Sequence, residues 1–530
     1  MKLARRRMGL LAGMLLGSLF GVSVHAAVIE PELGQLLHSR GAGDSISVIV
    51  TFQSAVNPWS FSEADQRQRR SHILQALKQE ATGFPAQVAR IADRRGATRL
   101  RPLWAAHALA LSAGPGLLRD LAALPGVESI RQDRTMRVFA SSRGNHSIQP
   151  VRNGLPSVWK PRHDPNHAGP PEESTPHETV ARAADLSSVS SASTSPPEWN
   201  LTAVKAPDLW AMGFTGQGVV VASLDTGVDV EHPDLAAQYR GGAHSWYDPH
   251  GEHLAPADLD GHGTHAMSLA VGRVRGGTAI GMAPDAQWIA AKLFNDAGYS
   301  RESLMHQSLQ WVLDPDGDVS TDDAPDVVNL SWAVATVNVC NRVFQDELDA
   351  LQASGVAVVM SAGNSGPGVS TSISPANNLG QLSVGSVDQQ FTLSPFSSRG
   401  PSACDGGTFP AVVAPGEQVR AADVSFGGMP NYATVTGTSF AAPHVAGALA
   451  LLMSAVPAAQ LPVLESALKA TAVSLGPHED SVPPGPGLID TLAAYRAVLI
   501  GSGSDPGGAI DHESARPGGD ATGLRQEVPR

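Results

Sequence analysis

Short runs of consecutive apolar residues recur through the C-terminal part of this chain. Such runs are typical of strands buried on both faces of a parallel sheet; they lie at 219–224, 288–293, 327–330 and 356–360. Apolar residues at helical spacing fall between them, over 264–272, 300–313 and 343–353. This alternation predicts an α/β fold, with a mostly parallel central sheet covered by helices on both faces. Sheets of this kind hold their active sites at the carboxyl ends of the strands.

The N-terminal part has a mixed pattern that predicts a separate small α+β domain. Residues 45–52 alternate between apolar and polar, as a half-buried strand does. Residues 62–94 carry apolar positions at helical spacing. Two further strands and a short helix are predicted at 104–111, 126–130 and 117–124.

The ends and the middle of the chain do not resemble packed domains. Residues 1–26 combine a basic start, an apolar run over 10–20 and a small-residue pattern, which is typical of a secretory signal peptide. The run is shorter than the ~20 residues of a membrane-spanning helix, so a signal peptide is favoured over an anchor. Residues 140–197 are predicted to be a Ser/Pro-rich linker that is cut on maturation, and 501–530 a flexible C-terminal tail.

Charge is divided unevenly between these segments. The 530 residues have a formal net charge of −13, which disfavours nucleic acid or an anionic membrane as the main partner. Residues 27–139 hold 14 basic and 10 acidic residues, whereas 198–500 hold 11 basic and 30 acidic residues. The two cysteines, Cys340 and Cys404, form either one disulfide or two thiols.

Three polar motifs lie at predicted strand ends or helix starts. Asp225 ends an apolar run before Thr226-Gly227, and His262 lies between two glycines in Asp260-Gly261-His262-Gly263-Thr264-His265. Ser439 begins a run of small residues, 438–448. Each has an ordinary alternative: a turn cap for Asp225, a helix position for His265 and an N-cap for Ser439. A zinc site is not predicted, because two histidines three residues apart without the glutamate of zinc peptidases do not form that motif.

Taken together, the motifs DTGVD, HGTH and GTSFAAPHVAG resemble those of the subtilisin-like serine protease family, the subtilases. The aspartate, histidine and serine also follow one of the known chain orders of the serine triad. The resemblance covers 198–500, and the stretches 198–216 and 314–332 look most like bacillopeptidase F-type members. It implies a subtilisin-like three-layer catalytic domain over 198–500. Residues 44–139 resemble the family's propeptide, so 27–139 are expected to be a prosegment.

The resemblance also implies a role for individual residues. Ser439 would attack the peptide carbonyl, His262 would accept its proton and Asp225 would orient the imidazole. Asn364 would donate to the oxyanion together with the Ser439 N–H group. An extended substrate would lie along Ser331-Trp332-Ala333 and Gly363. Trp332 is interpreted either as a rim of the primary pocket or as part of the core, and the absence of charge nearby predicts apolar or unselective cleavage.

No metal is assigned to the catalytic site and no cofactor is required for its chemistry. The acidic stretch 314–323 offers alternating oxygen ligands suited to Ca²⁺, but Pro325 stands where an EF-hand needs glutamate. It is either a solvated acidic loop or a calcium site, and structural calcium elsewhere is compatible with the family.

The predicted function is that of a secreted serine endopeptidase, extracellular or periplasmic, made as a zymogen. Its partners would be protein or peptide substrates and its own basic prosegment, an inhibitor attracted by charge. Neither nucleic acid nor, after signal removal, a membrane is expected, and the enzyme is expected to be a monomer. The alternative is a catalytically silent subtilase-fold binding protein. The presence of Asp225, His262, Ser439 and Asn364 favours the enzyme.

Overall fold

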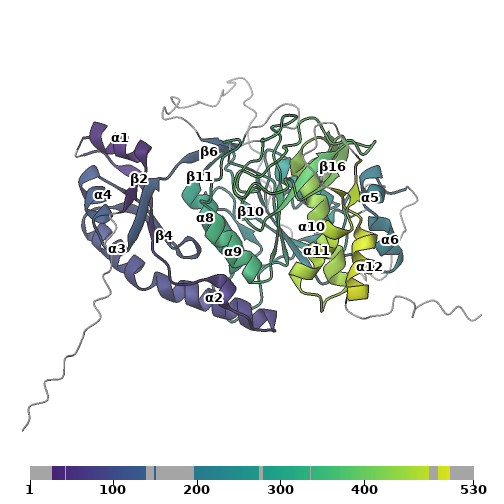
Figure 1. The fold of residues 1–530 in the computed structure, drawn as a ribbon, viewed down its shortest axis with the longest axis horizontal. Helices are drawn as coiled ribbons and strands as arrows, with labels where there is room; N and C mark the ends of the chain where they lie inside the picture. Colours follow the sequence, from purple (N-terminus) through teal and green to yellow (C-terminus); the bar gives the residue numbers. More distant parts are fainter. Residues whose placement is uncertain are drawn as a thin grey trace, which may run out of the picture. The chain divides into compact units, whose positions relative to one another are not determined.

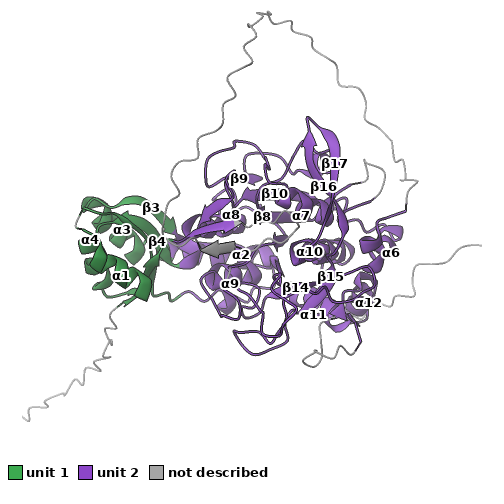
Figure 2. Ribbon diagram, turned by 90° about the horizontal axis from the view of Figure 1, so that it is seen from above, with its two compact units in different colours: residues 1–55, 80–102, 107–133 green, residues 56–79, 103–106, 134–530 purple. Residues whose placement is uncertain are grey.

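The computed structural model describes residues 27–41, 43–138, 148–150, 196–273, 279–334, 336–476 and 487–501. The predicted signal peptide, most of the linker and nearly all of the predicted tail lie outside the described residues. The described residues form two units, coloured separately in Figure 2. The smaller unit takes in 27–55, 80–102 and 107–133, and the larger unit takes in 56–79, 103–106 and the chain from 134.

The smaller unit is a five-stranded sheet with helices packed on it. The strands lie in the order β1-β5-β2-β4-β3, with bounds β1 Val28–Ile29, β2 Ile46–Phe52, β3 Thr98–Leu103, β4 Ala108–Ala113 and β5 Val127–Gln132. Its helices are α1 Pro31–Ser39, α3 Phe84–Arg94 and α4 Pro115–Ala122. Apolar residues of the sheet and helices, among them Leu33, Val48 and Leu118, form its core.

The structure refines one prediction for the N-terminal elements and corrects another. The helical stretch 62–94 is two helices, α2 (Gln66–Ala81) and α3, because the chain turns at Gly83, whose N–H group donates to Glu80 O. The strand predicted from residue 104 begins at Ala108, after a 3-10 turn over 104–106. His107 between them has φ 48°, a left-handed conformation that does not fit a continuous strand.

The larger unit is built on a nine-stranded sheet. Figure 1 shows most of this unit in teal, green and yellow. Its order is β18-β19-β15-β14-β13-β12-β8-β10-β9. The strands are β8 Val220–Asp225, β9 Trp246–Tyr247, β10 Gln287–Lys292, β12 Val327–Leu330, β13 Ala357–Ser361, β14 Leu382–Val387, β15 Val412–Pro415, β18 Val473–Ser474 and β19 Gly487–Leu488. All pair in parallel except β18 with β19. The predicted α/β fold with a mostly parallel sheet is confirmed.

Helices cover both faces of this sheet, because successive strand residues point to opposite sides. Val221 packs with the core that contains α7 and α10, whereas its neighbour Ala222 packs with the core that contains α8 and α9. The helices of the unit are α5 Trp199–Ala203, α6 Ala206–Ala211, α7 His262–Val271, α8 Glu302–Leu313, α9 Gln345–Ala353, α10 Thr438–Ala455, α11 Leu461–Ala470 and α12 Thr491–Gly501. The result is the three-layer arrangement that the sequence predicts.

Helix α10 lies at the centre of this unit. It is long and apolar enough to cross a membrane by length and composition, and no other described helix is. Because 83% of it is buried inside the unit, these properties belong to a core helix. Its first turn lies beside the carboxyl ends of the strands.

Two smaller sheets complete the larger unit. A hairpin of β16 (Val419–Phe426) and β17 (Met429–Val435) packs against α7. In the other sheet, β6 (Thr135–Val138) pairs antiparallel with both β11 (Tyr299–Arg301) and β7 (Ile148–Pro150). Cys340 and Cys404 are joined in a disulfide, so the alternative of two thiols is excluded.

Candidate active site

The central pair of the site joins a strand end to a helix start. Asp225 is the last residue of β8, and His262 is the first residue of α7. The imidazole Nδ1 lies 2.7 Å from Asp225 Oδ1, and both side chains are 3% exposed. Asp225 Oδ1 also accepts the Thr226 N–H group at 2.7 Å, so the predicted turn cap is present alongside the histidine contact.

The charge around His262 favours its protonated form. Burial works against a charged imidazole, but Asp225, through its charge and its hydrogen bond, outweighs it, with Asp260 and Asp258 adding to the effect. The net result raises the pKa of His262 above its ordinary value. The site therefore stabilises an imidazolium, which is the state that a general base reaches after accepting a proton.

Glycines let the two turns approach each other. A Cβ on Gly263 would lie 2.1 Å from Gly227 O, and a Cβ on Gly227, whose φ is 120°, would lie 1.9 Å from Ala257 O. Larger residues at either position would push the turn of Asp225 away from the helix of His262. The group that approaches Gly263 most closely is the backbone of Gly227.

Two further residues hold this turn, and the sequence analysis missed both. The buried carboxylate of Asp258 accepts the N–H groups of Gly261 and Thr264 and the Thr264 hydroxyl, at 2.7–2.9 Å. These hydrogen bonds lower its pKa in spite of its burial. The buried Lys292 Nζ donates to Thr226 O at 2.7 Å. Asp258 could have been found as an aspartate three residues before the Gly-His-Gly motif. Lys292 has no such signal, because it resembles any other residue at a strand end.

Ser439 lies in the first turn of α10. The N-cap position is Gly437, so the N-cap alternative for Ser439 was wrong. Its hydroxyl donates to Ser331 O at 3.2 Å, and the Ser331 hydroxyl donates to Ser439 O at 2.7 Å. The next residue, Phe440, is buried with its ring centroid 5.3 Å from that of His262. This tilted ring contact brings the start of α10 against the histidine of α7.

Asn364 lies beside the same helix start with its amide oriented by Thr438. Its Oδ1 accepts both the N–H group and the hydroxyl of Thr438, each at 2.9 Å. The Nδ2 group is buried and has no acceptor among the described residues. A donor held in this way, on the helix turn that carries Ser439, suits an oxyanion that forms only during a reaction.

The remaining predicted substrate-binding residues lie at the ends of β12 and β13. Trp332 is 3% exposed and packs edge-on against Phe344. Of the two interpretations, pocket rim or core residue, its position supports the core residue. Ser331 and Ala333 are buried on either side of it. Gly363 has φ 95°, and a Cβ there would lie 2.6 Å from Ile373 Cγ2, so a side chain is not tolerated.

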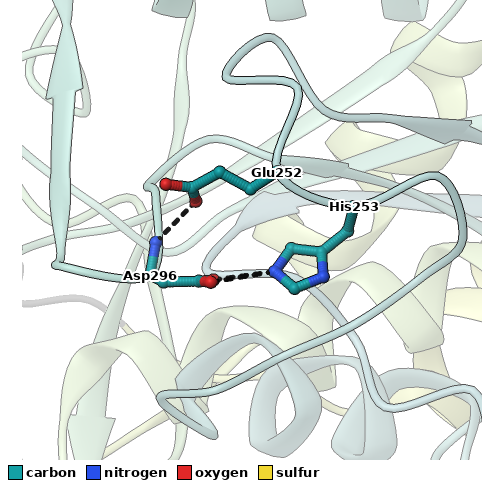
Figure 3. Close-up of side chains that lie close together, drawn as sticks. All are labelled: Glu252, His253 and Asp296. Carbon is teal, nitrogen blue, oxygen red and sulfur yellow. Dashed lines mark hydrogen bonds and ion pairs between the residues drawn. The ribbon is translucent and has the colours of Figure 1, made fainter.

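Two groups of acidic and histidine side chains in the described part of the chain have the spacing to hold a metal. In the first, shown in Figure 3, His253 Nε2 donates to Asp296 at 2.9 Å and Glu252 accepts the Asp296 N–H group. Lys292 Nζ lies 3.1 Å from the same Asp296 carboxylate, so this group already has cationic partners. The second consists of Asp314, Asp316 and Asp323, within the stretch predicted as a calcium loop.

Strand β6 of the predicted prosegment is paired with the catalytic segment. Its partner β11 follows β10 in the chain, and Met136 lies opposite Ser300. Met136 is buried in the core that contains α8 and α9, and the Arg137 guanidinium lies over the Tyr299 ring at 5.3 Å. A strand added to an edge in this way pairs through its main chain, which is also how an extended peptide binds to a sheet edge.

The comparison with known proteins identifies the class to which this fold and site belong. The family model described as the subtilase family matches residues 216–489. That range includes Asp225, His262, Asn364 and Ser439. The chain therefore belongs to the subtilase family, whose members are subtilisin-like serine endopeptidases.

Individual relatives agree with this class. Bacillopeptidase F of Bacillus subtilis (strain 168) is 36% identical over 335 residues, which cover 58% of this chain but 23% of that protein. Subtilisin Savinase of Lederbergia lenta is 34% identical over 299 residues, which cover 56% of this chain and 98% of that protein. The major intracellular serine protease of Bacillus subtilis (strain 168) is 35% identical over 260 residues, or 73% of its length. Family membership alone therefore leaves the cellular location open.

Proposed function

We propose that the chain is an exported serine endopeptidase made as a zymogen, with Ser439, His262 and Asp225 as its catalytic triad. The observation that carries the proposal is the 2.7 Å contact between His262 and Asp225, with Phe440 of the first turn of α10 packed against the imidazole. This arrangement suits acyl transfer. A neutral serine is a weak nucleophile until an oriented base accepts its proton.

The reaction would proceed in two steps. The Ser439 oxygen attacks the peptide carbonyl while His262 takes the hydroxyl proton, and the carbonyl electrons move to an oxyanion that Asn364 Nδ2 and the Ser439 N–H group stabilise. Collapse expels the amine, which receives its proton from His262 and leaves an acyl-enzyme. Water then attacks the ester by the same route, which releases the acid and restores Ser439. No cofactor takes part.

The substrate would be an extended polypeptide chain lying beside Ser331-Trp332-Ala333 and Gly363. Because Trp332 and Ala333 are buried, they would shape this path mainly through their backbone. Apolar or unselective side chains are expected at the scissile bond.

The zymogen part of the proposal is supported by the pairing of β6 with β11. While residues 135–138 lie on this edge, a substrate that uses the same backbone groups is excluded. Cleavage within 140–197 would free the edge. Export is supported by the 1–26 pattern and by the Cys340–Cys404 disulfide, since disulfides persist mainly in oxidising compartments.

A fluorophosphonate probe tests the proposal, because it labels serines that an active triad has made nucleophilic. We expect labelling of the matured protein at Ser439 and its loss in Ser439→Ala. The matched control is Ser454→Ala, which removes a hydroxyl from the same helix and should leave labelling intact. Correctly matured protein that takes no label would instead support the silent binding protein, which nothing in the site or the relatives favours.

A further inference from the structure

A proline interrupts the hydrogen bonds of the helix that carries Ser439. Pro443 lies inside α10 and has no N–H group, so the carbonyl oxygen of Ser439, four residues earlier, receives no helical hydrogen bond. The hydroxyl of Ser331 donates to this carbonyl instead, at 2.7 Å. Side chains from other elements therefore help to hold the first turn of α10.

The next carbonyl of the same turn is held by a histidine. His444 Nδ1 lies 2.8 Å from Phe440 O, and because a carbonyl oxygen can only accept, Nδ1 carries the proton. The His444 side chain is fully buried, and burial lowers its pKa to about 4. The imidazole is therefore neutral at pH 7, and its other nitrogen, Nε2, is a hydrogen-bond acceptor.

A buried asparagine from the start of the catalytic segment donates to that nitrogen. Asn200, in α5, is 0% exposed, and its Nδ2 lies 2.7 Å from His444 Nε2, although 244 positions separate the two residues. The preceding residue, Trp199, packs against the small apolar cluster that contains Phe440. Two consecutive residues of α5 thus support the helix that carries Ser439.

The polar nature of Asn200 is costly at this position. Burial removes its amide from water, and its Oδ1 has no hydrogen-bond partner among the described residues. A leucine would fill a similar volume without this desolvation cost. An amide here is therefore better explained by orientation of the imidazole than by stability of the core.

We propose that Asn200 is a positioning residue for the nucleophile: it fixes the imidazole of His444, which in turn fixes the Phe440 carbonyl. The turn held in this way carries the Ser439 hydroxyl and N–H group, and the Phe440 ring that packs against His262. Displacement of a reacting group by ~1 Å can cost ~10²-fold in rate. The inference rests on the proposed function, because it needs Ser439 to be the group that reacts.

The test compares Asn200→Leu with the wild type as matured enzymes. We expect kcat to fall about tenfold at unchanged KM, and the rate of fluorophosphonate labelling of Ser439 to fall in parallel. The matched control is Gln238→Met, which also replaces a buried amide by an apolar side chain. Gln238 donates to Pro284 O and not to α10, so this change should leave both rates as they are.

Asn200→Asp separates positioning from packing. A carboxylate favours a protonated imidazole, so His444 would donate from both nitrogens and keep its hydrogen bond to Phe440 O. We expect kcat in Asn200→Asp to lie within about threefold of the wild type. The pKa of His444, followed by NMR, should rise from about 4. A kcat as low as that of Asn200→Leu would contradict the positioning role.

A second measurement needs no catalysis. In the full chain with Ser439→Ala, the NMR signals of the His262 imidazole should move on Asn200→Leu and stay in place on Gln238→Met, because Phe440 packs against that ring.

The proposal is overturned if Asn200→Leu labels as fast as the wild type, if its KM rises at unchanged kcat, or if the His262 signals do not move. A wild-type chain that never labels would contradict the proposed function, and the His262 signals would still decide the role of Asn200.

Discussion

Asp225 Oδ1 and His262 Nδ1 are 2.7 Å apart, although 37 positions separate the two residues in the chain. A second pair of the same type, His265 with Asp423, lies one turn further along α7 at 3.0 Å. The first pair faces the start of α10, which carries Ser439, whereas the second joins α7 to the β16–β17 hairpin. This difference provides a matched test of which pair acts in catalysis.

Replacement of Asp225 by asparagine should lower kcat by about 10⁴-fold with little change in KM, because the imidazole loses the carboxylate that holds its tautomer. The same change at Asp423 should leave kcat within about threefold of wild type, because this half-buried pair joins α7 to the hairpin and does not orient His262. Steady-state kinetics on the matured variants measure both. Equal losses in the two variants would show that the assignment of Asp225 is wrong.

Replacement of Asn364 by leucine should lower kcat by about 10²–10³-fold, the usual cost of one oxyanion donor. KM should stay close to wild type, because the donor acts on the oxyanion and not on the bound peptide. Thr438→Val, which removes one of the two groups that orient Asn364, should give a smaller loss in the same direction. A rise in KM with unchanged kcat would assign Asn364 to substrate binding instead.

The acidic limb of the activity profile should depend on Asp260. Burial lowers the pKa of His262, but the charges of Asp225, Asp260 and Asp258 together raise it above its ordinary value. The base works only when neutral, so activity is lost as the pH falls through this raised pKa. Asp260→Asn removes one charge that favours the imidazolium, and should move the acidic limb of kcat/KM to lower pH.

The control for this prediction is Asp405→Asn, an exposed carboxylate that is not among the charges acting on His262. The pH dependence of kcat/KM in Asp405→Asn should match that of the wild type. A limb that moves to higher pH in Asp260→Asn would contradict the sign of the effect.

The enzyme should tolerate peroxide at the position after the nucleophile. Members of the family often carry methionine there, whereas this chain has Phe440, which packs against His262 and forms no sulfoxide. Activity after brief exposure to mild peroxide should stay near the untreated value, and Phe440→Met should create a sensitive enzyme. Rapid loss in the wild type, with the modification mapped next to Ser439, would refute this expectation.

Much of the fold follows from local sequence. The runs at 219–224, 288–293, 327–330 and 356–360 correspond to β8, β10, β12 and β13 within about one residue, because burial on both faces demands continuous apolar positions. The errors were also local: the turn at Gly83 and the left-handed His107 interrupt patterns that apolar spacing alone reads as continuous.

The sequence by itself determined the family, the candidate catalytic residues and the alternation of strands and helices, since these depend on neighbouring residues and short motifs. Contacts between distant segments were decided by tertiary structure. The core position of Trp332, the contact of Lys292 with Thr226, and the ammonium of Lys78 against Asp314 all depend on which elements pack together. Apolar periodicity specifies which face of an element is buried. The partner on that face follows from strand order and helix packing, which no local pattern contains.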